Sequence, residues 1–239
     1  MPTVTSQTKP SFLQQLWGRF SSPEQQPQAA PAAPAKPVKA SERWGAVPYK
    51  GFSVYKTDYS TGRPETLPTV FDTTQTEANL AKTGKADPRY KENVEPSLLH
   101  ALYDAQKISP HIKISPEEVV TLIAQEGRSD LGANPKDIMG GWTQNPRAVE
   151  LNNKLQEMGY NIYDAGTAAL LLDKQMTAKR LSIRHNKNVP WQAVWNGLGE
   201  TKTGRTGYDY AREYGMNAKN IGMNQEALNI VRQHMREPG

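Results

Sequence analysis

The sequence predicts an all-α domain that follows a disordered, extended N-terminal arm. From Pro96 onward, apolar residues recur at helical spacing in several separate stretches, and none alternates with the period of two that marks a half-buried strand. Before that point, long stretches are rich in Pro, Ala and Gln and poor in apolar residues. Such a composition buries too little surface to offset the entropy of the chain, which is why the arm is predicted to be disordered.

Residues 1–45 form the predicted arm, and one short segment inside it differs from the rest. In residues 11–20 (SFLQQLWGRF), apolar side chains recur at helical spacing behind Ser11, which is suited to cap a helix. So short a helix is not stable alone in water. We therefore expect the segment to dock into a groove of a protein partner. Anchoring at a membrane surface and an incidental pattern are the alternatives.

Residues 46–95 are predicted to be an extended, irregular segment. Aromatic residues are more frequent there than in the arm, but Pro and Gly interrupt any regular pattern. Tyr49, Phe52, Val54 and Tyr55 suit either a short strand or a segment that wraps against the core. No motif in this segment indicates chemistry.

The helical domain itself is assigned to residues 96–236. Helices are expected at about 97–107, 116–126, 146–158, 164–184, 190–196 and 224–236. The second has the most complete start signal, with Ser115 as N-cap, Pro116 at the first helical position and Glu118 closing a capping box. Gly127 is predicted to end that helix.

Composition and charge exclude several classes of function. The chain has no cysteine, which rules out disulfides, zinc fingers and thiol catalysis, and its four histidines are too far apart for a local metal motif. We expect no cofactor. The net charge of +5 suits an anionic partner, but without a run of five Lys/Arg residues it does not favour nucleic acid. No stretch has transmembrane length, and the N-terminus has no signal-peptide pattern.

Glu126 is the candidate catalytic residue because of its place on the second predicted helix. It follows Leu122 by four residues and Ile123 by three, so it shares their apolar face. It also falls in the last turn, where the helix dipole disfavours an anion. Both effects favour the protonated form of a carboxylate, as a general acid near neutral pH requires. The structural alternative is a helix-end carboxylate held by Arg128 or Arg180.

Four stretches around and after Glu126 resemble, in order, the motifs of soluble lytic transglycosylases, which are related to goose-type lysozyme. They are LIAQE at 122–126, GWTQ at 141–144, Asn161 to Gly166 before an apolar run, and AVWNGLG at 193–199. The corresponding family motifs are an apolar run ending in Glu-Ser, Gly-Leu-Met-Gln, Asn-Ile-x-x-Gly and Ala-Tyr-Asn-Ala-Gly. The resemblance covers about residues 96–236 and implies a lysozyme-like fold that cleaves peptidoglycan.

The resemblance also implies a mechanism with a single carboxylate. Glu126 would protonate the glycosidic oxygen between N-acetylmuramic acid and N-acetylglucosamine. The resulting carboxylate would then accept the proton of the muramic 6-hydroxyl as a 1,6-anhydro ring closes. Alternatively, Asp130 or Asp137 would act as a second carboxylate that positions water, and the product would be a reducing sugar.

A substrate-binding set follows from the same resemblance. It consists of Ser129, Gly141, Trp142, Gln144, Trp195, Asn196, Gly197 and Tyr208. Gln144 and Asn196 would hold N-acetyl or hydroxyl groups, and the aromatic residues would face the sugar rings, with Tyr210 as the alternative to Tyr208. Core packing is the competing interpretation of both tryptophans. The chain departs from the family at Gly127, where a serine is expected, and at Trp195, where the family has tyrosine.

The arm and the absence of a signal pattern together suggest a bacteriophage virion protein. Such a protein would act in the host periplasm or cell wall while the phage delivers its genome. A secreted effector and an endolysin are the next candidates. The alternative from another class is a non-catalytic structural or ejection protein of the virion on a lysozyme-like scaffold, because a fold does not guarantee chemistry.

Overall fold

Helices make up most of the chain that the structure describes, which confirms the helical character predicted from the sequence. The computed structural model describes residues 38–44, 50–66, 70–72, 93–111, 113–128, 146–185 and 189–236. All of them belong to one unit, Pro37–Gly239, which is distinct from a second unit, Met1–Lys36. No helix in the described ranges is long and apolar enough to cross a membrane.

Six of the helices confirm the ranges expected from sequence to within a few residues. The helices are α2 (Ala40–Trp44), α4 (Pro96–Ile108), α5 (Pro116–Arg128), α7 (Pro146–Glu157), α8 (Ile162–His185), α9 (Trp191–Asn196), α10 (Gly207–Gly222) and α11 (Gln225–His234). One bound was wrong, since α5 continues through Gly127 to Arg128.

The start of α5 follows its sequence signal. The Glu118 backbone N–H donates to Ser115 Oγ (3.1 Å), and the Ser115 backbone N–H donates back to Glu118 Oε2 (3.0 Å). This capping box satisfies two of the amides that a helix start leaves without partners. Further along, Leu122 and Ile123 are fully buried, so the same face carries Glu126 toward the interior.

Helix α10 was not predicted; Gly215 interrupts its sequence, and two further glycines stand at its ends. Two signals for it are nevertheless present. Thr206 and Asp209 form a capping box, in which the Thr206 backbone N–H donates to Asp209 Oδ2 (2.9 Å) and the Asp209 N–H to Thr206 Oγ1 (3.3 Å). Tyr210, Tyr214 and Ile221 are buried at spacings of four and seven residues, which is one face of a helix.

Two small antiparallel β elements lie in the segment that was predicted to be irregular. In the first, β1 (Lys50–Ser53) pairs with β4 (Val70–Asp72) on one side and with β5 (Asn93–Val94) on the other. The second is a hairpin of β2 (Thr57–Asp58) and β3 (Arg63–Pro64). The all-α prediction is therefore corrected to a mostly helical fold with a little β structure. Both alternatives given for this stretch are found, since Phe52 lies in β1 and Phe52, Val54 and Tyr55 are buried in the hydrophobic core.

Helix α2 corrects the predicted end of the arm. The Ala40 backbone N–H donates to the Met158 carbonyl (2.7 Å), and the Trp44 ring stacks on His100 with 3.9 Å between ring centroids. Arg43 forms an ion pair with buried Asp104 (3.0 Å). Residues 40–44 are thus part of the helical body. The remainder of the predicted arm, including residues 11–20, lies outside the described residues.

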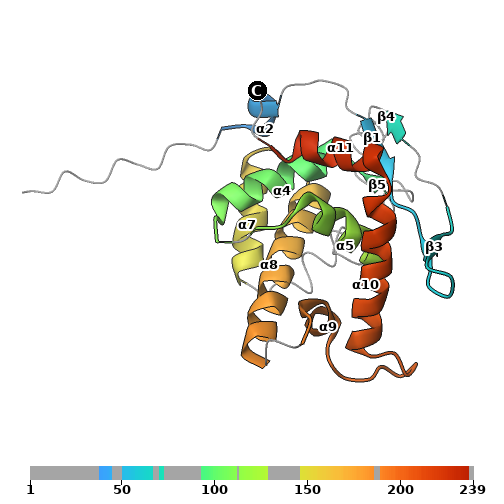
Figure 1. The fold of residues 1–239 in the computed structure, drawn as a ribbon. Helices are drawn as coiled ribbons and strands as arrows, with labels where there is room; N and C mark the ends of the chain where they lie inside the picture. The colour runs from blue at the N-terminus through green and yellow to red at the C-terminus, as the bar shows by residue number, and fades with distance from the viewer. Residues whose placement is uncertain are drawn as a thin grey trace, which may run out of the picture. The chain divides into compact units, whose positions relative to one another are not determined.

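The site is positioned by the way α5, α8, α9 and α10 meet. Short α9 contacts both α8 and α10, and it lies between the lower parts of these two long helices in Figure 1. Helix α5 contacts α10 along much of its length and α8 to a smaller extent. The C-terminal end of α5, with Glu126, therefore faces the ends of α9 and α10.

Candidate active site

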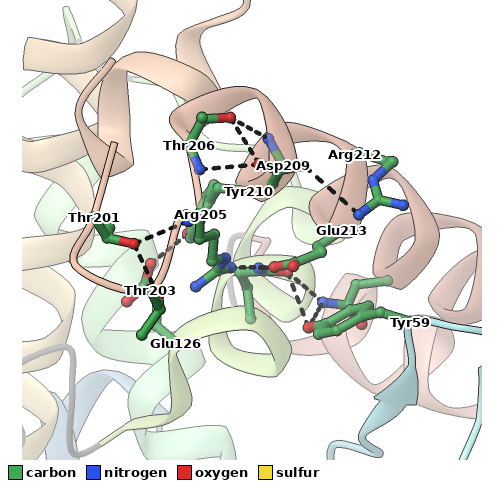
Figure 2. Close-up of polar contacts among 12 residues, drawn as sticks. Tyr59, Glu126, Thr201, Thr203, Arg205, Thr206, Asp209, Tyr210, Arg212 and Glu213 are labelled. Atoms are coloured by element: carbon green, nitrogen blue, oxygen red, sulfur yellow. Dashed lines mark hydrogen bonds and ion pairs between the residues drawn. The ribbon is translucent and has the colours of Figure 1, made fainter. Parts of the chain in front are cut away.

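Glu126 is held by two aromatic side chains from two other helices. Trp195 Nε1 in α9 donates a hydrogen bond to Glu126 Oε1 (2.8 Å), and the Tyr210 hydroxyl in α10 donates to the same oxygen. Both donors are buried, with exposed fractions of 6% for Trp195 and 2% for Tyr210. Figure 2 shows Tyr210 beside Glu126. The carboxyl group is thus fixed in position by neutral donors.

A close approach of two helices brings these donors together. A Cβ on Gly207, the first residue of α10, would lie 2.4 Å from the carbonyl oxygens of Ala193 and Gly197. Only glycine lets the start of α10 pack this tightly against the end of α9. Tyr210 follows one turn later, so it reaches the carboxylate that Trp195 also contacts.

The second oxygen of Glu126 has a different environment. Both hydrogen bonds end on Oε1, and within the described part of the chain no side chain donates to Oε2. A carboxyl group with one oxygen anchored and the other open can present a proton to a ligand in a fixed direction. Burial, the charge of Glu126 and the hydrogen bond to it all raise the pKa of Tyr210, so its hydroxyl remains a donor.

A cation lies over the ring of each aromatic donor. Lys174 Nζ in α8 is 4.4 Å from the centroid of the Trp195 ring, and the Arg205 guanidinium carbon is 5.5 Å from that of Tyr210. Burial lowers the pKa of Lys174, and the negative charge of Glu126 opposes that shift. Two positive charges therefore lie next to the two side chains that hydrogen-bond to Glu126.

Gln125, the residue before Glu126, anchors the end of α5 to a second polar network. Gln125 Nε2 donates to Glu213 Oε2 (3.2 Å), and Gln125 Oε1 accepts from Asn217 Nδ2. Tyr59, in the turn between β2 and β3, accepts a hydrogen bond from Asn217 Nδ2 (3.1 Å). Arg205 forms an ion pair with Glu213 (Figure 2). These contacts fix the rotation of the last turn of α5, and hence the direction of Glu126.

Glu213 is a second carboxylate close to this site, but it is already engaged. It accepts hydrogen bonds from both Gln125 and Arg205. A carboxylate committed to a guanidinium and an amide is suited to hold structure in place, not to activate water. The described residues thus place one carboxylate with an open oxygen at the site, which is Glu126.

The structure brings some of the predicted site residues together and separates the two candidate tyrosines. Trp195 contacts Glu126, while Asn196 and Gly197 lie at the end of the same helix. Whether Tyr208 faces a sugar ring stays a prediction, but Tyr210 and not Tyr208 contacts the carboxylate, and the Tyr208 side chain is 54% exposed. The physical reason is that two positions along a helix differ by about 200° in direction. Ser129, Gly141, Trp142, Gln144, Asp130 and Asp137 lie outside the described residues.

Sequence reasoning missed Lys174, Arg205 and the network around Gln125. A signal existed for Lys174, which follows buried Leu171 by three residues and precedes buried Ala178 by four. A lysine on the apolar face of a helix predicts that its charged group lies partly buried against the protein. Nothing in the sequence placed Tyr59 near the site, because that contact spans 158 residues.

The donor types at the site are not those of a metal centre. Among the described residues, no group of three or more His, Asp and Glu side chains lies close enough together to hold a metal ion. The site offers instead one carboxyl group, two aromatic hydrogen-bond donors and two cations.

Comparisons with known proteins returned nothing. No protein-family model matches the chain, and neither a curated protein nor a solved structure is significantly similar to it. The resemblance to lytic transglycosylases therefore depends on the four sequence stretches alone.

Proposed function

We propose that this protein cleaves the glycan strand of peptidoglycan at the β-1,4 bond between N-acetylmuramic acid and N-acetylglucosamine. The observation that supports the proposal best is the anchoring of Glu126 Oε1 by Trp195 and Tyr210, with Oε2 left open among the described residues. This geometry suits a group that must deliver a proton and take one back without moving.

In the proposed reaction, Glu126 is first acid and then base. The proton on Oε2 passes to the glycosidic oxygen, and the bond from that oxygen to muramic C1 breaks. The muramic O6 then bonds to C1, and its proton returns to Glu126, which regenerates the acid. The substrate supplies the nucleophile, so one carboxylate is enough.

Trp195 and Tyr210 would support this cycle by hydrogen bonding. When Glu126 loses its proton, negative charge develops on a carboxyl group that already accepts two hydrogen bonds. Preorganised donors of this kind stabilise a developing charge without having to reorient. One departure from the family pattern fits this role, because the Trp195 that replaces tyrosine still provides a hydrogen-bond donor.

We place this activity in a phage virion, where the enzyme would open the cell wall during genome delivery. The support is the Pro/Ala-rich composition of the N-terminal region and the amphipathic pattern of residues 11–20, which suits docking to a particle protein. This part of the proposal is independent of the chemistry and has its own test in the Discussion.

Loss of turbidity of outer-membrane-permeabilised Gram-negative cells tests the proposed activity. The wild type is compared with Glu126→Gln, which keeps both hydrogen-bond contacts but removes the proton donor, and with Glu226→Gln at an exposed position. We expect Glu226→Gln to clear cells like the wild type and Glu126→Gln to be slower by about 100-fold or more.

Two outcomes would contradict the proposal in different ways. Equal clearing by the wild type and Glu126→Gln would refute the role of Glu126. No clearing by any of the three proteins would favour the alternative function, a non-catalytic structural or ejection protein of the virion.

A further inference from the structure

We propose that Lys174 forms an anion-binding subsite beside Glu126, which takes a carboxylate carried by the lactyl arm of N-acetylmuramic acid. The inference rests on the proposed function and adds the feature that sets the register of the glycan strand. The carboxylate has two possible sources: the free lactyl group of a strand without peptides, or the stem peptide attached to that group.

The first observation is where the Lys174 ammonium lies. Its position on the apolar face of α8 holds the side chain against the protein, and Nζ reaches the ring of Trp195 at 4.4 Å from the centroid. Because Trp195 Nε1 donates a hydrogen bond to Glu126, the Trp195 side chain contacts both the ammonium and the candidate acid. The ammonium, the indole ring and the carboxyl group of Glu126 therefore lie next to one another.

The second observation is that Lys174 has no ion pair among the described residues, whereas two other cations that lie over aromatic rings do. Lys179, five residues along α8, lies over the ring of Trp191 and is also paired with Glu118 at 2.9 Å. Arg205 is paired with Glu213. For Lys174, no carboxylate of the described chain lies at ion-pair distance, although the charge of Glu126 acts on it.

An ammonium in this environment favours an anionic ligand. Burial removes water from Lys174, and the contact with Trp195 offsets part of that cost. In the proposed acid form, Glu126 is neutral and supplies no counter-charge. A carboxylate from the ligand would complete the pair at the moment when the acid is ready to act.

The chemistry of the glycan strand identifies which sugar carries that carboxylate. N-acetylglucosamine is neutral, whereas the lactyl arm of N-acetylmuramic acid carries either its own carboxylate or those of the stem peptide. The bond proposed for cleavage joins C1 of N-acetylmuramic acid to N-acetylglucosamine. A cation beside the acid would therefore favour this bond over the alternate bond, in which the sugars are exchanged.

Isothermal titration calorimetry of the Glu126→Gln protein tests the subsite without turnover. The ligands are neutral chitotetraose, an alternating muramic tetrasaccharide with free lactyl carboxylates, and the same tetrasaccharide with stem peptides. Lys174→Met is added to remove the charge and Lys174→Arg to keep it. Lys179→Met is the matched control, because it removes a cation over Trp191 on the same helix.

We expect Lys174→Met to weaken binding of at least one muramic ligand by about tenfold and to change chitotetraose binding by less than about twofold. Lys174→Arg and Lys179→Met should keep the preference for the muramic ligand. In the protein without a change at Lys174, added salt should weaken muramic binding more than chitotetraose binding. This salt comparison does not depend on how the lysine variants fold. The muramic ligand that loses affinity identifies the source of the carboxylate.

Failure of this inference can be told apart from failure of the proposed function. Equal weakening of all ligands by Lys174→Met, or no preference for muramic ligands at the outset, would overturn the subsite while leaving glycan binding intact. If the Glu126→Gln protein bound no glycan and the wild type cleared no cells, both the subsite and the proposed function would be wrong.

Discussion

At the scale of single residues, the site depends on two hydrogen bonds that converge on one oxygen of Glu126. The donors are 69 and 84 positions away along the chain, and each is buried. Hydrogen bonds to a charged group are worth more than those between neutral groups, about 1.5–3 kcal/mol each. In the proposed reaction Glu126 gains a negative charge, so we expect Trp195 and Tyr210 to influence the rate of that reaction more than the stability of the fold.

The change Tyr210→Phe removes one of these donors and keeps the ring. We expect the rate of cell clearing to fall by about 10- to 100-fold, since the carboxylate that forms in the reaction loses a charge-assisted hydrogen bond. Tyr103→Phe is the matched control, because that ring on α4 lies against Arg43 and Lys107 and not against Glu126. An unchanged rate in Tyr210→Phe would mean that the contact with Glu126 has no part in catalysis.

The sequence predicted individual site residues only where a local pattern marked them. Glu126 was found because it shares a helix face with Leu122 and Ile123, and Trp195 because it falls in a recognisable short stretch. Tyr208 was chosen in place of Tyr210 because α10 had not been recognised, and without the helix the direction of each tyrosine was unknown. Contacts such as that of Tyr59 are set by tertiary packing, which no local pattern reports.

At the scale of elements, the packing of α10 against α9 is what delivers Tyr210 to Glu126. The contact depends on Gly207, where a side chain would meet two backbone carbonyls at 2.4 Å. Helix boundaries such as those of α4, α7 and α8 were predictable, because capping and apolar periodicity are local properties. The small strands were not predictable as a sheet, because β1 pairs with residues that are far from it in sequence.

Gly207→Ala should both destabilise the protein and slow its reaction. The added methyl group forces α10 away from α9, which we expect to cost about 1–3 kcal/mol in the free energy of unfolding and to displace Tyr210. Gly215→Ala is the matched control, since its position within α10 has open space and alanine should stabilise it by about 0.5–1 kcal/mol. Urea denaturation measures both variants; equal stability of the two would contradict the close-packing argument.

A histidine pair between α4 and α11 makes the stability of the body sensitive to acid. His100 Nε2 lies 3.0 Å from His234 Nδ1, and Trp44 stacks on the His100 ring. Burial, and then the charge of His234, lower the pKa of His100 to about 3. Burial, and then the charge of Arg236, also lower the pKa of His234. Both histidines are therefore favoured in the neutral form in the folded protein.

Their contribution to stability should be complete above about pH 6.5, the usual pKa of histidine in an unfolded chain. As the pH falls from there toward 3, the unfolded chain takes up protons that the folded protein does not, so stability is lost. The slope should approach about 1.4 kcal/mol per pH unit for each such histidine. His100→Phe should flatten this dependence in urea denaturation series, whereas His111→Gln at an exposed position should not. Identical slopes in the wild type and His100→Phe would contradict the prediction.

At the scale of the whole molecule, the helical body begins at α2, and the region before it forms a separate unit. The composition predicted this division approximately, because the Pro/Ala-rich stretch lacks the apolar residues at helical spacing that mark the later part of the chain. The boundary was placed too late, since the anchoring of α2 depends on Arg43 and Trp44 meeting Asp104 and His100 across the fold. Each of those contacts joins residues more than 50 positions apart, so no local sequence pattern could predict it.

Two truncations separate the functions of the two units. Removal of residues 1–36 should leave cell clearing and the melting temperature unchanged and should release the protein from phage particles. Removal of residues 1–44 also deletes the contacts of Arg43 and Trp44, and should lower the melting temperature by several degrees, about 2–4 °C per kcal/mol lost. Retention of the shorter truncation in particles would refute docking through the arm. Equal melting temperatures of the two truncated proteins would refute the stabilising role of α2.

The central claim, that Glu126 drives cleavage of the glycan strand, is tested most directly by mass spectrometry of the muropeptides released from purified peptidoglycan sacculi. We predict that the wild type releases muropeptides with 1,6-anhydro ends, each lighter by one water than the reducing form, and that Glu126→Gln releases none above the level of a buffer control. Release of the same products by both proteins, or by neither, would contradict the claim.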